Sequence, residues 1–138
     1  MSYHTELELD RRSANKHARI LKNAVKRHGI TDPVLIGTGS SGMGTISILG
    51  CLTGFSKVYV RKQNDISHHG AVNPGSTIFS KSLIFCDDVI DSGDTFKYVL
   101  EQVAKVNWPV IVGYYVLGRY KGHRSVRDMG YIDFGESV

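Results

Sequence analysis

The sequence has little of what marks a secreted, disulfide-bonded or membrane-spanning protein. It holds only two cysteines, too few for a disulfide framework, and Cys51 and Cys86 each lie in an apolar run where a free thiol packs as a small hydrophobic group. No segment approaches the roughly 18 to 20 apolar residues that cross a bilayer. The first residues lack the basic start and apolar stretch of a signal peptide. These absences predict a protein of the reducing cytoplasm.

A strong charge of either sign is also missing. The net charge is +4, and 41% hydrophobic with 22% charged residues is ordinary for a globular domain. This surplus suits an anionic ligand, but without a cluster of cations it does not predict nucleic acid binding. A length of 138 residues fits one domain, 1–138, with a core that needs no disulfide.

Helical and strand patterns alternate along the chain. The predicted order is helix 13–28, strand 34–36, glycine-rich segment 37–42, helix 43–52, strand 57–61, loop 63–81, strand 82–86, helix 94–106, strand 109–117 and a short strand at 131–134. This alternation predicts an α/β fold with a mainly parallel, twisted sheet flanked by helices. Ligands of such sheets bind beyond the C-terminal ends of the strands. The long loop 63–81 is typical of a flexible lid, and the terminal segments, including the polar tail 118–138, are predicted to form a small hood.

The stretch Leu83–Thr95, LIFCDDVIDSGDT, is the most informative part of the sequence. Four apolar residues form a strand, Asp87 and Asp88 end it, and a short polar turn opens a helix. The turn offers hydroxyls and backbone N–H groups to a phosphate, and Gly93 lets the backbone approach it closely. Adjacent carboxylates can accept hydrogen bonds from vicinal hydroxyls or hold a hydrated Mg²⁺. The segment therefore predicts a ligand with a phosphate at one end and sugar hydroxyls or a metal at the other, unless the acidic strand end arose by chance.

This segment resembles the phosphoribosyl-pyrophosphate motif of the type I phosphoribosyltransferases, and the resemblance extends over about Val34–Val116. It implies that Asp87 and Asp88 contact the ribose hydroxyls and, through water or substrate, a Mg²⁺. It implies that the 5-phosphate is bound by Asp91, Ser92, Gly93, Asp94 and Thr95. The implied reaction is the Mg²⁺-dependent exchange of pyrophosphate for a nucleobase nitrogen at ribose C1. Phosphoribosyl pyrophosphate and a nucleobase would be the partners, and a homodimer is the usual assembly of the family.

The glycine-rich segment 37–42, GTGSSG, supports three interpretations. It occupies the place of the family's pyrophosphate loop, so the resemblance implies contacts to pyrophosphate from Thr38, Gly39, Ser40, Ser41 and Gly42, helped by the dipole of the following helix. It also matches the dinucleotide fingerprint, which expects an acidic residue about 20 positions further on. Arg61 stands there and would suit only the 2′-phosphate of NADP. The third interpretation is a turn of purely structural use.

The pair Arg61 and Lys62 is similar to the orotate and adenine branch of the family, where two cations precede a flexible lid. Cations there would neutralise the leaving pyrophosphate, although a solvated strand end is the alternative. The segment 67–70, SHHG, more closely resembles short phosphoribosyltransferase-like proteins of tailed bacteriophages, which would place the protein in a host cytoplasm. His68 and His69 either donate to pyrophosphate when protonated or are exposed loop residues.

The nucleobase is left open. Asp91 stands where the 6-oxopurine enzymes carry an Asp that exchanges a proton with the purine ring, although Asp is also a good helix N-cap. The resemblance thus implies catalytic roles for Asp91, Lys62 and His69. Either Tyr114 or Tyr115 could stack on a base, and the other should face the core because strand side chains alternate.

Two functions other than transfer stay open. The glycine-rich segment lacks the Lys or Arg that several family members carry there, and the orotate enzymes have a further Lys after Lys62 that is missing here. These gaps favour a nucleotide-binding or regulatory module of the same fold without turnover. An NADP-binding domain is the third possibility. The basic run 119–127 is either a solvated face or part of a base-binding hood.

Overall fold

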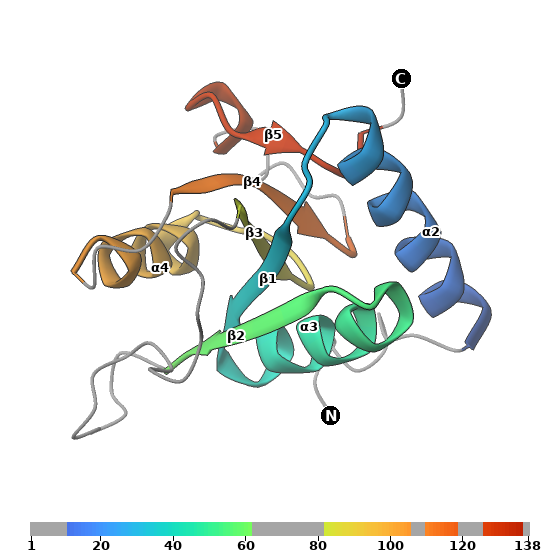
Figure 1. Ribbon diagram of the computed structural model, residues 1–138. Helices are drawn as coiled ribbons and strands as arrows, with labels where there is room; N and C mark the ends of the chain where they lie inside the picture. The colour runs from blue at the N-terminus through green and yellow to red at the C-terminus, as the bar shows by residue number, and fades with distance from the viewer. Residues whose placement is uncertain (1–10, 62–81, 106–109, 119–125, 137–138) are drawn as a thin grey trace.

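Five parallel strands form one sheet in the part of the chain that the structure describes, residues 11–61, 82–105, 110–118 and 126–136 (Figure 1). The elements of this computed structural model are α2 (Arg11–Arg27), β1 (Pro33–Thr38), α3 (Gly39–Thr53), β2 (Ser56–Val60), β3 (Ser82–Asp87), α4 (Asp94–Lys105), β4 (Ile111–Val116) and β5 (Ile132–Asp133). The strand order is β2-β1-β3-β4-β5, and every neighbouring pair is parallel. The predicted α/β fold with a parallel sheet is confirmed.

Helices cover both faces of the sheet. Figure 1 shows α4 on one side and α2 with α3 on the other. Leu21 of α2 and Leu49 of α3 share a core with Leu35 of β1, whereas Val99 of α4 packs in a second core with Ile36 of the same strand. Three layers therefore enclose two cores, one on each face.

Burial on both faces explains the sequence of the central strands. Successive side chains of a strand point to opposite faces, so a strand covered on both sides reads as a continuous apolar run. In β3, Leu83 and Phe85 join the core under α4, while Ile84 and Cys86 join the core under α2 and α3. The run ends at Asp87, where the strand reaches the edge of the sheet.

Most predicted elements are confirmed to within a few residues, but two expectations are wrong. Helix α3 begins at Gly39 rather than Met43, so most of the glycine-rich segment is the first turn of a helix and not a loop. Cys51 is exposed on α3, whereas Cys86 is fully buried as predicted. Both errors concern α3. Because this helix has no charged residue, the sequence does not show which of its faces is exposed, and its packing decides both its start and the exposure of Cys51.

The described part of the tail joins the sheet. β5 pairs with β4 close to the predicted strand at 131–134, and Phe134 is fully buried in the core shared with α2. The predicted lid at 63–81 and residues 119–125 of the predicted hood lie outside the described residues. Among the helices that the structure describes, none has the length and apolar character to cross a membrane.

The strand order creates a crevice at one edge of the sheet. From β1 the chain passes to α3 on one face, and from the adjacent strand β3 it passes to α4 on the other face. Neighbouring strands that send their connections to opposite faces leave a gap beyond their C-terminal ends, where open α/β sheets bind ligands. In this chain that point lies between Thr38 and Asp87.

Candidate functional site

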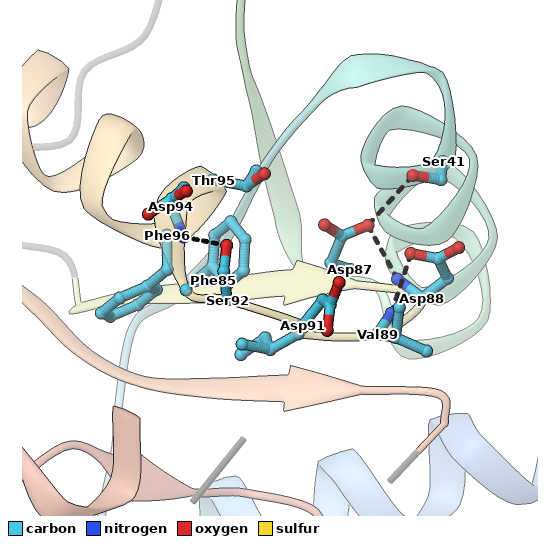
Figure 2. Close-up of a pocket in the computed structure, with 12 residues that line it drawn as sticks. Ser41, Phe85, Asp87, Asp88, Val89, Asp91, Ser92, Asp94, Thr95 and Phe96 are labelled. Atoms are coloured by element: carbon cyan, nitrogen blue, oxygen red, sulfur yellow. Dashed lines mark hydrogen bonds between the residues drawn. The ribbon is translucent and has the colours of Figure 1, made fainter. Parts of the chain in front are cut away.

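A pocket of about 550 Å³ opens at this switch point (Figure 2). Eight of the side chains and backbone segments that line it were predicted as site residues from the sequence: Ser41, Asp87, Asp88, Asp91, Ser92, Gly93, Asp94 and Thr95. The remaining lining residues are Phe85, Val89, Ile90 and Phe96. The pocket therefore brings together one residue of α3 and the whole turn between β3 and α4.

The acidic pair forms the floor of the pocket at the end of β3. Asp87 is 7% and Asp88 is 4% exposed, so both carboxylates are nearly removed from solvent. Oδ1 of Asp87 accepts hydrogen bonds from the Ser41 hydroxyl at 3.2 Å and from the Asp88 backbone N–H at 2.8 Å. Oδ1 of Asp88 accepts one from the Val89 backbone N–H at 2.8 Å. Local backbone donors thus fix the orientation of both side chains.

Proton affinity at this pair is unusual. Burial, followed by the neighbouring Asp88, raises the pKa of Asp87 to about 7, while the hydrogen bonds from the Asp88 N–H and the Ser41 hydroxyl oppose that rise. Two carboxylates held this close in a desolvated site disfavour full ionisation unless a cation or a hydrogen-bond donor joins them. A sugar diol or a hydrated metal ion supplies such groups.

The backbone of the acidic pair is held from the other side by the end of β4. The Leu117 N–H donates to the carbonyl of Asp87 at 3.2 Å, and the Gly118 N–H donates to the carbonyl of Asp88 at 2.7 Å. These bonds continue the β3–β4 pairing beyond the strand. The two carboxylates therefore sit on a rigid part of the sheet, which favours precise placement of a ligand.

The turn before α4 is built differently, with exposed side chains around a buried glycine. Gly93 has φ of 88°, a left-handed conformation that other residues adopt at a cost, and it is buried. The Asp94 N–H donates to the Ser92 hydroxyl at 3.2 Å. Asp91 and Thr95 are exposed, and Figure 2 shows Thr95 at the start of α4, across the pocket from Ser41. A helix N-terminus with hydroxyls and a glycine beside it is a suitable site for a phosphate.

The end of β1 contributes less than the sequence predicted. Ser41 lines the pocket, but Thr38, Gly39, Ser40 and Gly42 do not. The Thr38 side chain is buried, and its hydroxyl donates to the carbonyl of Val60 at 2.5 Å. In this arrangement the Thr38 hydroxyl links β1 to β2, and the contact with pyrophosphate stays a prediction.

Close packing explains the glycine at position 37. A Cβ on Gly37 would lie 3.0 Å from the carbonyl oxygen of Gly42 and 3.1 Å from that of Cys86. Gly42 itself is buried against Gly37. Gly37 lets α3 start directly against β1 and β3, whereas a Cβ on Gly42 would make ordinary contact at 3.5 Å with Gly37. The structural interpretation of this segment therefore holds for Gly37.

Arg61 lies at the end of β2 and is exposed, outside the residues that line the pocket. The Tyr98 hydroxyl of α4 donates to the backbone carbonyl of Arg61 at 2.7 Å. Together with the bond from Thr38 to Val60, this contact holds the end of β2 from both sides. The predicted partners Lys62, His68 and His69 lie outside the described residues.

Neither tyrosine proposed for base stacking is available. Tyr114 is 0% and Tyr115 is 2% exposed, because helices cover both faces of β4 and alternation places one ring in each core. The Tyr115 hydroxyl hydrogen-bonds Nδ1 of His17 at 2.6 Å. The sequence did not single out Tyr98 as a residue near the site, since its contact joins residues 37 positions apart.

Neither a protein-only metal cage nor an activated thiol is found at the site. Within the described ranges no group of three or more His, Cys, Asp or Glu side chains could hold a metal ion. Burial, and then Asp87, raises the pKa of the Cys86 thiol, so it stays uncharged and unreactive. The chemistry of the pocket therefore rests on carboxylates, hydroxyls and backbone N–H groups.

Comparison with known proteins identifies the fold. No family model and no curated protein matches the sequence. Among solved structures, the chain is similar to adenine phosphoribosyltransferase from Thermoanaerobacter pseudethanolicus, with a TM-score of 0.69 and 15% identity over 91% of this chain and 81% of that one. Orotate phosphoribosyltransferase from Aeropyrum pernix gives 0.68 and 18% over 90% and 70%. Adenine phosphoribosyltransferase from Saccharomyces cerevisiae, complexed with D-2,5-dideoxy-2,5-imino-altritol 1,6-bisphosphate and adenine, gives 0.69 and 15% over 87% and 76%.

These identities are too low to carry over an activity, but the structural similarity extends over most of both chains. The chain has the fold of the type I phosphoribosyltransferases.

Proposed function

We propose that this protein transfers ribose 5-phosphate between phosphoribosyl pyrophosphate and a nucleobase. The observation that carries the proposal is the juxtaposition, in one pocket, of a buried acidic pair with a polar turn at a helix N-terminus. A ligand that fits both must have hydroxyls or a metal at one end and a phosphate at the other. Ribose 5-phosphate has this shape, and the fold neighbours named above are phosphoribosyltransferases.

In this proposal the acidic pair binds the ribose. The 2′- and 3′-hydroxyls donate to the carboxylates of Asp87 and Asp88, which lie at the end of β3. The 5-phosphate accepts hydrogen bonds from backbone N–H groups of 92–95 and from the hydroxyl of Thr95. Because the carboxylates are fixed by their own backbone contacts, the sugar is held in one orientation with C1 toward the open side of the pocket.

The pyrophosphate lies toward α3 in this arrangement. Ser41 is at the pocket wall, and the N-terminus of α3, which begins at Gly39, would contribute the positive end of the helix dipole. Arg61 and Lys62 would follow from the end of β2 and neutralise the charge that develops as the C1–O bond breaks. The role of Lys62 and of His69 is proposed from the sequence resemblance alone.

Magnesium fits the donor set as an ion shared with the substrate. Mg²⁺ usually keeps several waters and binds one or two carboxylates together with substrate phosphates, and Asp87 and Asp88 are two such carboxylates. When bound, it would offset the charge of the pyrophosphate and favour the ionised form of Asp87. The protein side chains themselves position the sugar and exclude water from C1.

Transfer then needs little side-chain acid–base chemistry. The C1–O bond to pyrophosphate breaks, the nucleobase nitrogen forms the new bond to C1, and the carbon passes through an oxocarbenium-like state that placement and charge stabilise. Asp91 lines the pocket with an exposed carboxylate and would exchange a proton with the base if the base is a 6-oxopurine. We leave the identity of the base open.

The test is pyrophosphate release. The full-length protein is incubated with phosphoribosyl pyrophosphate, Mg²⁺ and, one at a time, adenine, hypoxanthine, guanine, xanthine, uracil and orotate. Release of pyrophosphate with one base and formation of its nucleotide supports transfer. The Asp87→Asn, Asp88→Asn double variant serves as the control for a contaminating enzyme and should release none.

A binding module without turnover is the second candidate. The first turn of α3, Gly39 to Gly42, contains no cation, so the pyrophosphate side of the pocket has less positive charge than transfer would favour. This candidate predicts that ribose 5-phosphate or a nucleotide binds while no base releases pyrophosphate. The NADP interpretation is weaker, since the strand order differs from the dinucleotide order 3-2-1-4-5-6.

A further inference from the structure

The basic surplus of the chain is concentrated on one helix. The 17 residues of α2 hold seven Lys and Arg and no Asp or Glu, and all seven side chains are exposed: Arg11, Arg12, Lys16, Arg19, Lys22, Lys26 and Arg27. Since the whole chain has 17 basic and 13 acidic residues, the part outside α2 has ten and 13 and is net negative. The net charge of +4 therefore understates how strongly polarised the surface is.

Little in the described structure neutralises this face. Arg27 donates to the backbone carbonyl of Glu136 at 3.2 Å, but the carboxylate of Glu136 pairs with Arg127 at 3.6 Å. Within the described ranges, no carboxylate forms an ion pair with a cation of α2. His17 adds no charge to the face, because burial and then Lys16 lower its pKa. The free cations of α2 suit an extended polyanion.

The opposite side of the helix excludes insertion into a membrane. Ala14, Ala18, Leu21, Ala24 and Val25 are buried, and most of them pack in the core under the sheet. A helix that binds at a bilayer interface must offer its apolar face to the lipid, and this face is already occupied. Only the charged side of α2 faces outward.

The shape and composition of the exposed face favour a double helix over a single strand. At about 1.5 Å per residue the helix is roughly 25 Å long, which matches about seven base-pair steps of a duplex. α2 contains no Phe, Tyr or Trp, the residues on which single-stranded bases stack. Asn15 and Asn23, both exposed, add hydrogen-bond donors suited to phosphate oxygens.

We propose that the outer face of α2 binds the phosphate backbone of double-helical nucleic acid, without reading its sequence. The modest net charge predicted no such binding unless the cations cluster, and α2 is that cluster. This surface is distinct from the candidate pocket. None of the described residues that line the pocket belongs to α2, and α4, whose N-terminus bounds the pocket, covers the opposite face of the sheet from α2 (Figure 1).

The experiment compares two variants of the full-length chain with equal charge. The first replaces the three lysines of α2: Lys16→Gln, Lys22→Gln and Lys26→Gln. The matched control replaces three exposed lysines outside it: Lys57→Gln, Lys97→Gln and Lys105→Gln. Binding to a labelled duplex of about 20 base pairs, as DNA and as RNA, is followed by fluorescence anisotropy between about 50 and 200 mM salt. Far-UV circular dichroism checks that each variant is folded.

We expect the unmodified protein to bind duplex with an affinity that falls steeply with salt. The α2 variant should bind at least about tenfold more weakly, and the slope of the logarithm of its binding constant against the logarithm of salt concentration should be smaller by about two to three. The affinity of the control variant should stay within about threefold of that of the unmodified protein. Binding to only one of the two duplexes still supports the proposal and names the polymer. Saturating ribose 5-phosphate should leave duplex binding unchanged, so this result does not depend on the proposed transferase activity.

Three outcomes would overturn the proposal. If the unmodified protein binds neither duplex at about 50 mM salt, the outer face of α2 is not a nucleic acid binding site. An equal loss in both variants shows that diffuse charge, rather than α2, is responsible. Tighter binding to vesicles that contain phosphatidylserine than to either duplex assigns the face to an anionic membrane surface instead.

Discussion

The ends of β1 and β3 lie side by side at the same edge of the sheet, yet they are built for different purposes. Beyond β3 the chain forms an open polar turn, and Asp87 and Asp88 lie at its base. Beyond β1 the chain enters α3 at once, and Gly37 allows the helix to pack directly against the sheet. The first end opens into the pocket, whereas the second mainly packs against the first.

Glycine illustrates the difference. Gly93, in the turn that follows β3, has a left-handed φ of 88° that favours glycine and shapes the turn. Gly37 at the end of β1 is required because a side chain there would meet the backbone of Gly42 and of Cys86. Glycine therefore shapes an open turn beyond one strand and allows close packing beyond the other.

Removal of both carboxylates should have the largest effect on the β3 end. The Asp87→Asn, Asp88→Asn double variant should lower the affinity for ribose 5-phosphate by about a hundredfold, because charge-assisted hydrogen bonds to the diol are lost. Isothermal titration calorimetry measures the change, with the exposed Asp128→Asn as a control that should bind normally. Unchanged affinity in the double variant would show that the ligand is held elsewhere.

The single change Asp87→Asn should stabilise the protein in a pH-dependent way. The pKa of Asp87 is about 7 in the folded state against an ordinary value of 3.8. The stability that the protonated Asp87 contributes to the folded protein is therefore fully present below about pH 4 and is lost as the pH rises through 7. Asn is neutral throughout, and the gain in the free energy of unfolding should be about 3 to 4 kcal/mol larger at pH 8 than at pH 4, because each pKa unit of the shift is worth roughly 1.4 kcal/mol.

Urea denaturation at both pH values provides this comparison. Asp128→Asn, with an exposed side chain, should change stability by less than about 0.5 kcal/mol at either pH. A difference between Asp87→Asn and the unmodified protein that does not vary with pH would mean that the carboxyl of Asp87 is ionised normally in the folded state.

The turn before α4 can be tested through its glycine. Gly93→Ala should destabilise the protein by about 1 to 2 kcal/mol and lower the affinity for ribose 5-phosphate about tenfold, because a Cβ disfavours the left-handed backbone that shapes the turn. Gly130→Ala is a matched control, since Gly130 has φ of 98° with no atom near its Cβ position. It should lose stability with normal affinity, and a similar loss of affinity in both variants would remove the special role of the turn.

The smallest effect is expected at the end of β1. Thr38→Val should lower the free energy of unfolding by about 1 kcal/mol, because the carbonyl of Val60 loses its donor, and should leave pyrophosphate affinity within about twofold. Thr45→Val is the control for removal of a threonine hydroxyl, because it loses only a hydrogen bond to the backbone carbonyl of Ser41 within the same helix. A tenfold loss of pyrophosphate affinity in Thr38→Val would instead support the contact between Thr38 and pyrophosphate that the sequence predicted.

The sequence predicted the fold well because its signals are local. The apolar runs of β1 and β3 and the amphipathic pattern of α2 each lie within one element, and they alternate as a parallel sheet requires. It misplaced the start of α3 because glycines in a helix are disfavoured unless packing requires them, and packing is not visible in the sequence.

The candidate site could be predicted from the sequence where its residues lie close together along the chain. Asp87 to Thr95 form a contiguous segment, so their common pocket follows from one motif. The hydrogen bonds between distant residues could not be predicted in this way. The bond from Ser41 to Asp87 joins residues 46 positions apart, and the bond from Tyr98 to Arg61 joins residues 37 positions apart. The proposed exposure of a tyrosine in β4 was wrong because α2 and α3 cover one face of that strand and α4 the other.

The most direct test of the account is to locate ribose 5-phosphate on the protein. Titration of the ¹⁵N-labelled chain with ribose 5-phosphate and Mg²⁺ should shift the backbone amides of 92–95 and of Asp87 to Val89 most strongly, with smaller changes at Ser41. Saturable shifts confined to α2 or to the far edge of the sheet, or no shifts at millimolar ligand, would contradict it.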